Sequence, residues 1–427
     1  MPQNKRLVRI LAAIAIVALA AVAVLWLGAR TAFARRAAGD WIAGATGLPA
    51  TIGSLRIGFL PRPFVDVDEL AIAQPPGFGD GRLLEAGEIR VTVPWGSLFG
   101  TPAVDTISIG DAIARPMLAA DGADNWSGLI SRLAELGGEG EAAWSIGKLE
   151  FERGALEFHD LATGSQWRLT AITIAAENIA PAAEFPLELR MAAVAGPNTI
   201  HFALNGRGFV NPDAGHFAAN GLNFRGWAGG EPLPLAGLEM VGAAELLSYD
   251  SATGIAVISR GTFNVAGIPG EFKATLKRGE PDQQLMFSVT TDSFAPRAPA
   301  IAFGFPLPVT ADPEAYQALQ LSIEGRLEHG VVHLDPVAGR LDDTQFDGRI
   351  VPAERLIRAN IDRIDVNRYL APGQKALKEK KATLEAAIAE LGEFDIDAEV
   401  RIGEARIGGA KLRDSVIRVE RNAEAPK

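Results

Sequence analysis

Apolar and polar residues alternate with a period of two along much of this chain, and this pattern constrains its fold most strongly. Between residues 394 and 402, apolar side chains alternate with Asp395, Asp397, Glu399 and Arg401. The same pattern recurs in the segments 199–204, 255–265, 285–289, 321–327 and 415–420. Successive side chains of a strand point to opposite faces of a sheet, so this alternation predicts strands with one apolar face. We therefore expect a mostly β fold, an elongated antiparallel sheet with a few short helices.

Two segments with this pattern supply candidate binding residues. Leu149 and Phe151 alternate with charged residues, and the pattern resumes at Leu156 and Phe158 after Arg153-Gly154. We expect a hairpin that turns at Arg153-Gly154 and carries these four apolar side chains on one face. Near the C-terminus, a second apolar set is expected to share one face of a strand: Phe394, Ile396 and Val400.

Helical patterns are few. Short helices are expected at 40–45, 126–136 and 313–319, and a longer one at 375–391, which has an apolar stripe and a basic opposite face. That basic face fits simple solvation or contact with lipid headgroups. Since no strict repeat period is present, we expect successive β layers over residues 31–140, 141–370 and 371–427, the last including the helix and the terminal strands.

The N-terminal segment points to a membrane. Ile10–Ala29 is a run of 20 residues without a charge, and basic residues flank it on both sides. Such a run matches the length that crosses the hydrocarbon core of a bilayer. The alternative is a cleaved signal peptide, for which Ala32-Phe33-Ala34 offers a cleavage pattern. The run is longer than a usual signal-peptide core, which favours an uncleaved anchor in residues 1–30 with the N-terminus cytoplasmic.

Composition excludes several classes of function. The formal net charge of −11 argues against nucleic acid as a partner, because binding to phosphates requires clustered basic residues. The chain has no cysteine, which excludes disulfides, thiolate catalysis and cysteine-based zinc sites.

No motif in the sequence predicts an enzyme, a cofactor or a metal site. The G-x-S-x-G, P-loop and H-E-x-x-H patterns are missing. His329 and His333 would lie about 13 Å apart on one face of a strand, too far to share a metal ion. Asp342-Asp343 and Asp365 have no calcium-loop spacing and are interpreted as turn carboxylates. Asn125-Trp126-Ser127 matches a glycosylation sequon and is interpreted as a turn with a buried indole.

The order of these features resembles the AsmA family of bacterial envelope proteins, across nearly the whole chain. An uncharged N-terminal run is followed by a Thr-Gly turn, a proline-rich strand entry, a Pro-Gly turn and an Asp-Gly-x-x-Asn-Trp signature. The matching segments are Thr46-Gly47, 61–67, 75–77, 91–109, 121–126, 343–348, 364–370 and 392–419. Longer members continue with more strands after the position that matches Glu420, whereas this chain ends at Lys427. It therefore resembles a short member.

The resemblance implies an inner-membrane protein whose β-groove, of the kind found in lipid-transfer bridges, projects into the periplasm. Its function would be phospholipid transport or outer-membrane biogenesis, without catalysis, and acyl chains would contact the groove. An alternative is a scaffold or tether that binds envelope proteins and regulates outer-membrane protein assembly or targeting to the membrane. The strand at 415–420 is expected to expose an edge for an envelope protein or a second copy. From the residues alone, the pattern also fits an ordinary β core filled by its own side chains.

Overall fold

The computed structural model describes residues 32–419 except 100–102, 130–131, 133–143, 162, 196–197, 213, 231–236, 278–283, 329–330 and 373–395. The chain divides into two compact units. Unit 1 comprises residues 1–231 and 248–252, and unit 2 comprises residues 232–247 and 253–427.

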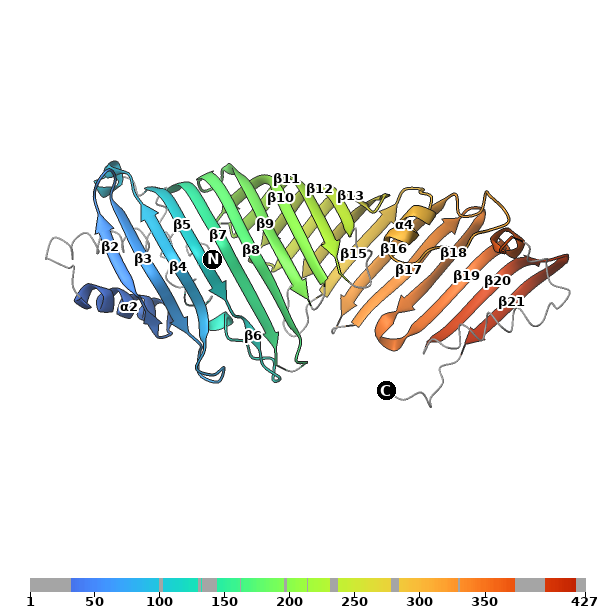
Figure 1. The fold of residues 1–427 in the computed structure, drawn as a ribbon, viewed down its shortest axis with the longest axis horizontal. Helices are drawn as coiled ribbons and strands as arrows, with labels where there is room; N and C mark the ends of the chain where they lie inside the picture. The colour runs from blue at the N-terminus through green and yellow to red at the C-terminus, as the bar shows by residue number, and fades with distance from the viewer. Residues whose placement is uncertain are drawn as a thin grey trace. The chain divides into compact units, whose positions relative to one another are not determined.

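Unit 1 is an open, mostly antiparallel sheet with one helix at its edge (Figure 1). Its elements are α2 (Ala32–Thr46), β1 (Ala50–Thr51), β2 (Ser54–Gly58), β3 (Phe64–Ala73), β4 (Arg82–Thr92), η1 (Trp95–Leu98), β5 (Ala103–Ala114), β6 (Met117–Leu118), β7 (Ser145–Asp160), β8 (Gln166–Ile179), β9 (Glu184–Ala195), β10 (Asn198–Asn211) and β11 (His216–Gly229).

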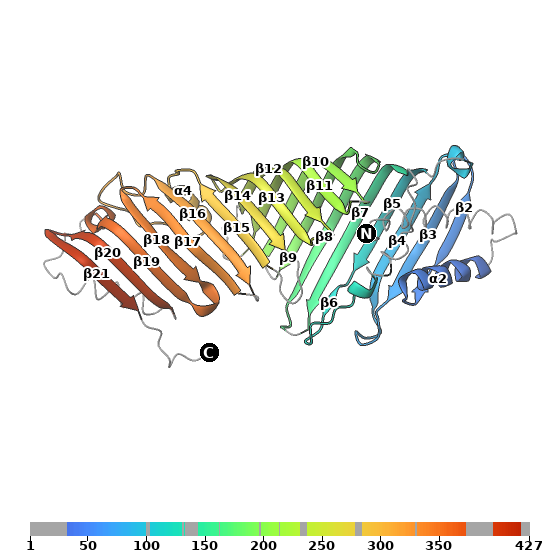
Figure 2. The ribbon, with the colours of Figure 1, turned by 180° about the vertical axis from the view of Figure 1, so that it is seen from behind.

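Unit 2 is likewise built of mostly antiparallel strands, seen from behind in Figure 2. Most of β12 (Leu238–Asp250) belongs to it, with β13 (Ile255–Val265), β14 (Ile268–Lys277), β15 (Gln284–Thr291), α4 (Arg297–Ala302), β16 (Leu319–Glu328), β17 (Val331–Leu341), β18 (Thr344–Val351), η2 (Pro352–Glu354), β19 (Leu356–Asp365), η3 (Val366–Tyr369), β20 (Asp397–Ile407) and β21 (Ala410–Val419). The mostly β fold expected from the sequence is thus confirmed.

Parallel pairs interrupt the antiparallel order at one place in each unit. In unit 1, β7 pairs in parallel with β5 and β6, and in unit 2 β20 pairs in parallel with β19. A parallel pair requires a long crossover, commonly a helix. The segments expected to be helical at 126–136 and 375–391 fall within these crossovers. The second segment and most of the first lie outside the described residues, and residues 127–129 are helical.

Two of the expected helices fall within the described residues, and one of them is present. The helix expected at 40–45 already includes Ala32 and continues to Thr46, and its partly buried Ile42 packs on the sheet. The helix expected at 313–319 is wrong: these residues form turns before β16. No helix among the described residues is long and apolar enough to cross a membrane, and Ile10–Ala29 lies outside them.

The hairpin expected at Arg153-Gly154 is also wrong, because β7 runs through this point as one strand of 16 residues. Arg153 has a φ of 53°, and the pairing with β8 shifts between Phe151 and Gly154. This is a β-bulge, an extra residue that bends a strand and increases its twist. Because of the extra residue, the apolar side chains shift from odd to even residue numbers but stay on the same face. In the sequence, this shift in the alternation looked like a turn.

The bulge of β7 belongs to a line that crosses several strands of unit 1, which we call the crease. Glu69 in β3, Asp111 in β5 and Ala171 in β8 have φ values of 55°, 52° and 50°. The side chains on the apolar face have odd residue numbers on one side of the crease and even numbers on the other. This holds for β3, β4, β5, β7 and β8. On the polar side, Arg153 donates two hydrogen bonds to Asp111, at 2.7 and 2.9 Å. Bulges at one height in neighbouring strands bend the sheet as a whole.

A second repeated device places a phenylalanine ring over a glycine on the neighbouring strand. Among the described strands, six paired positions have this arrangement. They are Phe64 with Gly58, Phe185 with Gly208, Phe263 with Gly270, Phe272 with Gly261, Phe287 with Gly325 and Phe346 with Gly339. The ring lies down over the glycine because no Cβ occupies that space, so the sheet surface there is flat and apolar.

The crease predicts opposite effects of glycine at two alanines of β8. In Ala171→Gly, glycine relieves the left-handed backbone at φ 50°, so we expect the unfolding free energy to rise by up to about 1 kcal/mol. In the control Ala175→Gly, in ordinary strand geometry, we expect a loss of about 0.5–1 kcal/mol. Denaturant unfolding of the full chain measures both. Equal losses in the two variants would contradict a left-handed residue at the crease.

The ring-over-glycine pairs predict a large cost for adding one methyl group. A Cβ at Gly325 would lie 2.1 Å from the Phe287 ring, so Gly325→Ala should displace the ring and lower the unfolding free energy by about 1–3 kcal/mol. The matched control is Gly409→Ala, in the turn between β20 and β21, where nothing lies within 4 Å. Melting curves of the two variants should differ clearly. A shift as small for Gly325→Ala as for the control would show that the ring does not cover this glycine.

Candidate functional site

The feature of unit 1 with the clearest chemical character is a row of paired apolar side chains that crosses nine strands. Paired residues of neighbouring strands share a face, so the strand register defines the row. Its members, from β2 to β11, are Leu55, Val67, Ile89, Ile109, Phe151, Ile174, Leu189, Leu204 and Phe224. We call the surface that contains this row the apolar face of unit 1.

The next row, one residue away on each strand, lies on the opposite face and is polar. It comprises Arg56, Asp66, Arg90, Ser108, Glu150, Ala175, Glu188, Asn205 and Asn223. Arg90 donates hydrogen bonds of 2.6 and 2.9 Å to the buried Asp66 carboxylate. The two faces of the sheet therefore differ sharply in chemistry.

Every member of the apolar row is partly buried and none is fully buried. A closed protein core covers most of its apolar side chains completely, whereas these retain contact with the surroundings. Trp167, also on this face, is 40% exposed and stacks on Phe158 with ring centroids 5.0 Å apart. The row is therefore partly exposed, while its neighbours Ile107, Ala112 and Ala176 on the same face are buried in two apolar clusters.

The four candidate residues of β7 lie on this face. Leu149 and Phe151 pair with Ile107 and Ile109 on one side of the crease. On the other side, Leu156 pairs with Ala114 and Phe158 with Trp167. The bulge keeps both pairs on one face, so the expected grouping arises from a single strand.

Unit 2 has an apolar face of its own, made of two adjacent rows. The first row is Ile258, Ala274, Phe287, Gly325, Leu334, Ile350, Ile357, Ala398 and Val419, and the second is Gly261, Phe272, Val289, Ile323, Val337, Gly348, Ala359, Val400 and Ile417. Val400 thus lies where the sequence placed it. Ile396 is partly buried just before β20, and Phe394 lies outside the described residues.

Shallow pockets in unit 2 are lined by charged and apolar residues of neighbouring strands. One, of about 450 Å³, is lined by Lys273, Ser288, Glu324 and Arg326 among others. Another, of about 460 Å³, is lined by Asp347, Arg349, Asn360 and Arg401 among others. These pockets mix both signs of charge, so they offer no concentrated charge for an ionic ligand.

The Asp-Gly-x-x-Asn-Trp segment has a structural role. Asn125 is 2% exposed, and its side-chain amide donates to Gln74 Oε1 at 2.7 Å and to the Arg115 carbonyl at 2.9 Å. Its Oδ1 accepts from the Met117 N–H at 2.8 Å. This side chain joins the ends of β3 and β5, and its burial leaves no room for a glycan. The buried group is thus the Asn125 amide, while the indole of Trp126 is partly buried.

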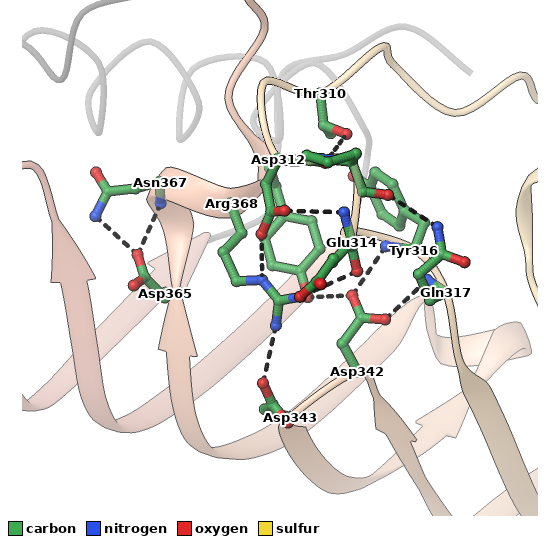
Figure 3. Close-up of polar contacts among 12 residues, drawn as sticks. Thr310, Asp312, Glu314, Tyr316, Gln317, Asp342, Asp343, Asp365, Asn367 and Arg368 are labelled. Carbon is green, nitrogen blue, oxygen red and sulfur yellow. Dashed lines mark hydrogen bonds and ion pairs between the residues drawn. The ribbon is translucent and has the colours of Figure 1, made fainter.

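The acidic residues near position 342 form a second structural cluster (Figure 3). The Asp342 carboxylate accepts from the backbone N–H groups of Tyr316 and Gln317 at 2.9 Å, and from Ala318 at 3.1 Å. The Tyr369 hydroxyl also donates to it, at 2.9 Å.

Arg368 completes the cluster by binding Asp312 at 2.7 Å and Asp343 at 2.9 Å. Asp365 accepts from the Asn367 N–H at 3.1 Å at the start of η3. The interpretation of Asp342, Asp343 and Asp365 as turn carboxylates thus fits these contacts.

Electrostatics in this cluster favour the ionised form of Asp342. Burial acts to raise the pKa of Asp342, but the backbone donors of Ala318, Tyr316 and Gln317 and the Tyr369 hydroxyl hold this pKa below its usual value. Burial, followed by the Asp342 carboxylate, raises the pKa of Tyr369, so its hydroxyl stays protonated and donates. The cluster fixes the 310–318 loop to the ends of β17 and β19.

Potential metal ligands are dispersed in the part of the chain that the structure describes, where no three histidine or acidic side chains are grouped to hold an ion. His333 lies in β17, and His329 falls in one of the gaps.

Sequence reasoning missed the glycines under the rings, and it also missed the bulged positions that keep apolar side chains on one face. The available signal was the change of phase within a strand, as between Phe151 and Leu156, without a turn doublet such as Asn-Gly.

The Asp342 cluster predicts pH-dependent stability. Replacing the charged acceptor in Asp342→Asn should lower the unfolding free energy at pH 7 by about 2 kcal/mol. The folded-state pKa of Asp342 is lowered, so its contribution is present above the unfolded-state pKa of about 4 and is lost as pH falls through the lowered value. Denaturant unfolding at pH 7 and in acid should show the deficit shrink in acid. The control Asp343→Asn, at a side chain 74% exposed, should change stability by less than about 0.5 kcal/mol. A deficit independent of pH would contradict this account.

Comparisons with known proteins give no further information on the apolar faces: no family model, no curated protein and no solved structure matches this chain.

Proposed function

We propose that this chain binds lipid acyl chains on its apolar faces and acts without catalysis in lipid transport or outer-membrane biogenesis in a bacterial envelope. The observation that carries this proposal is the apolar row across nine strands of unit 1, all of whose members are partly exposed. The resemblance to the AsmA family noted in the sequence agrees with it.

The energetics of such a surface suit a lipid. Each CH₂ group removed from water stabilises a complex by about 0.8 kcal/mol, so a long acyl chain gains affinity without any dedicated polar group. The shallow pockets of unit 2 mix both signs of charge and lack the concentrated charge that would select an ionic ligand. An acyl ligand therefore fits the chemistry of the faces better than a small polar one.

The cellular location is part of the proposal. The uncharged run Ile10–Ala29 is of the length that anchors a protein in a bilayer, with basic residues on both sides. In this proposal the N-terminus is cytoplasmic, and the two units lie in the periplasm beside the inner membrane. Such a protein receives lipids directly from the bilayer that holds it.

A scaffold that binds envelope proteins is the second candidate function. The exposed edge expected near Ser415–Glu420 favours it, because β21 lies at the last described position of its sheet and an open edge pairs readily with another strand. Val416 of this strand is 50% exposed on the polar face. A partner strand there would extend the sheet, which is compatible with lipid binding on the apolar face.

Neighbouring residues of β7 on opposite faces provide the test. Phe151→Lys places a charge on the apolar face, whereas the control Glu150→Lys places the same charge on the polar face. We expect at least a several-fold loss of co-purifying lipid, measured by mass spectrometry of gently extracted protein, in Phe151→Lys alone. Trp167→Lys, at a side chain 40% exposed, provides a second apolar-face variant that tolerates a charge with less risk to folding.

Circular dichroism confirms that each variant is folded before lipid is measured. Folded Trp167→Lys protein with the lipid content of the parent chain would contradict acyl binding on this face. Loss of lipid in Glu150→Lys to the same extent would also contradict it, because the effect would then follow charge and not the face.

A further inference from the structure

Two loops at one edge of unit 1 expose large apolar side chains. Leu60, in the loop between β2 and β3, is 82% exposed. Phe99, between β4 and β5, is 91% exposed, and Trp95 in the same loop is 44% exposed. Because β3 is antiparallel to β2 and β4, the end of β2, the start of β3 and the end of β4 lie at the same edge. We call Leu60, Trp95 and Phe99 the apolar tip.

The tip is built as one ordered unit. The Trp95 indole stacks on Phe59 with ring centroids 6.3 Å apart and donates to the Pro61 carbonyl at 3.2 Å. The Val93 N–H donates to the Pro63 carbonyl at 2.9 Å, which joins the two loops. In the second loop, Ser97 Oγ accepts from the Ala103 N–H at 3.2 Å. These contacts fix the Trp95 side chain and join the backbones of the two loops that carry Leu60 and Phe99.

The charge pattern of the tip suits a lipid surface. Arg62 is the only charged residue in the segments 59–64 and 94–99, and it forms an ion pair with Asp105 at the base of the tip. Tryptophan, phenylalanine and leucine are side chains that enter the interface of a bilayer. The Trp95 indole N–H already donates to the Pro61 carbonyl, so it would not enter the interface without a hydrogen-bond partner. Single side chains that project this far fit a deformable bilayer better than a protein surface, which must supply a matching pocket.

The uncharged run of the proposed function precedes the same unit that carries the tip. The run ends at Ala29, and α2 begins among the described residues at Ala32. Arg35 of α2 donates to the Gly53 carbonyl at 2.8 Å, and the Gly53 N–H donates to the Asp68 carbonyl in the middle of β3. The start of α2 is thus tied to the middle of β3, whereas the tip projects from the loops beyond the start of this strand at Phe64. In the proposed function, the anchor before α2 brings unit 1 close to a bilayer.

We propose that the apolar tip is a membrane-contact site that inserts into the lipid interface and holds unit 1 against a bilayer. This inference rests on the proposed function, which supplies the anchor. It adds a second point of contact, formed by Leu60, Trp95 and Phe99. Two attachment points fix the orientation of the sheet, whereas an anchor alone leaves it free to rotate.

The absence of cysteine from the sequence makes the test direct, because one introduced cysteine is the only labelling site. Leu60→Cys and Phe99→Cys in the full chain are labelled with an environment-sensitive fluorophore and reconstituted into phosphatidylethanolamine–phosphatidylglycerol vesicles. Leu161→Cys is the matched control. Leu161 is 54% exposed and follows the end of β7, at the strand ends opposite to those that carry the tip. We expect blue-shifted emission that doxyl-labelled lipid quenches at positions 60 and 99, and water-like emission that iodide quenches at position 161.

Other outcomes separate this inference from the proposed function. Protein that floats with the vesicles but has all three labels accessible to iodide overturns the tip and leaves the anchor intact. Labels shielded from iodide but insensitive to doxyl lipid also overturn it, since the tip then contacts protein. Protein that fails to float overturns the anchor of the proposed function, and the tip with it. Doxyl lipid placed only in added protein-free vesicles shows whether the tip contacts its own bilayer or a second one.

Discussion

The whole structure depends on the hydrogen-bonded register of its strands, because this register decides which side chains of neighbouring strands share a face of the sheet. Because paired residues share a face, a slip of one residue in any strand would break the apolar row of that unit. Unit 1 keeps the apolar face continuous across the crease, where Glu69, Asp111, Arg153 and Ala171 have left-handed backbones. Curvature and a continuous apolar face are thus achieved together, because neighbouring strands change phase at the same height.

Two buried polar side chains, Asn125 and Asp342, are hydrogen-bonded at the ends of strands and not on the apolar faces. The Asn125 amide and the Asp342 carboxylate have partners in nearby backbone and in the side chains of Gln74 and Tyr369, so they close loops at strand ends. The faces themselves contain aliphatic side chains, aromatic rings and glycines. This division between satisfied polar junctions and partly exposed apolar surfaces agrees with a ligand that is recognised by its hydrocarbon and not by its charge.

Sequence reasoning predicted the strands well, because period-two alternation survives even in half-buried sheets. It located β13 within its observed bounds and β15 to within two residues of them. It misread β7 because a bulge and a turn both interrupt the alternation, and only the pairing with β5 and β8 distinguishes them. The parallel pairs were also missed, although the segments expected to be helical, 126–136 and 375–391, lie in the sequence between the strands that pair in parallel. The ring-over-glycine pairs depend on register, which no single segment encodes.

The phenylalanine rings over glycines also affect how smooth the apolar face of unit 2 is. Phe272, Phe287 and Phe346 each fill the space above a glycine on the adjoining strand, so neither a ridge nor a hole marks these positions. In the function proposed above, a hydrocarbon chain that crosses these strands, about 4.8 Å apart, would meet a flat ring in place of a hole at each of these glycines. No such hole would hold the chain in place. This part of the surface would then favour sliding over tight residence.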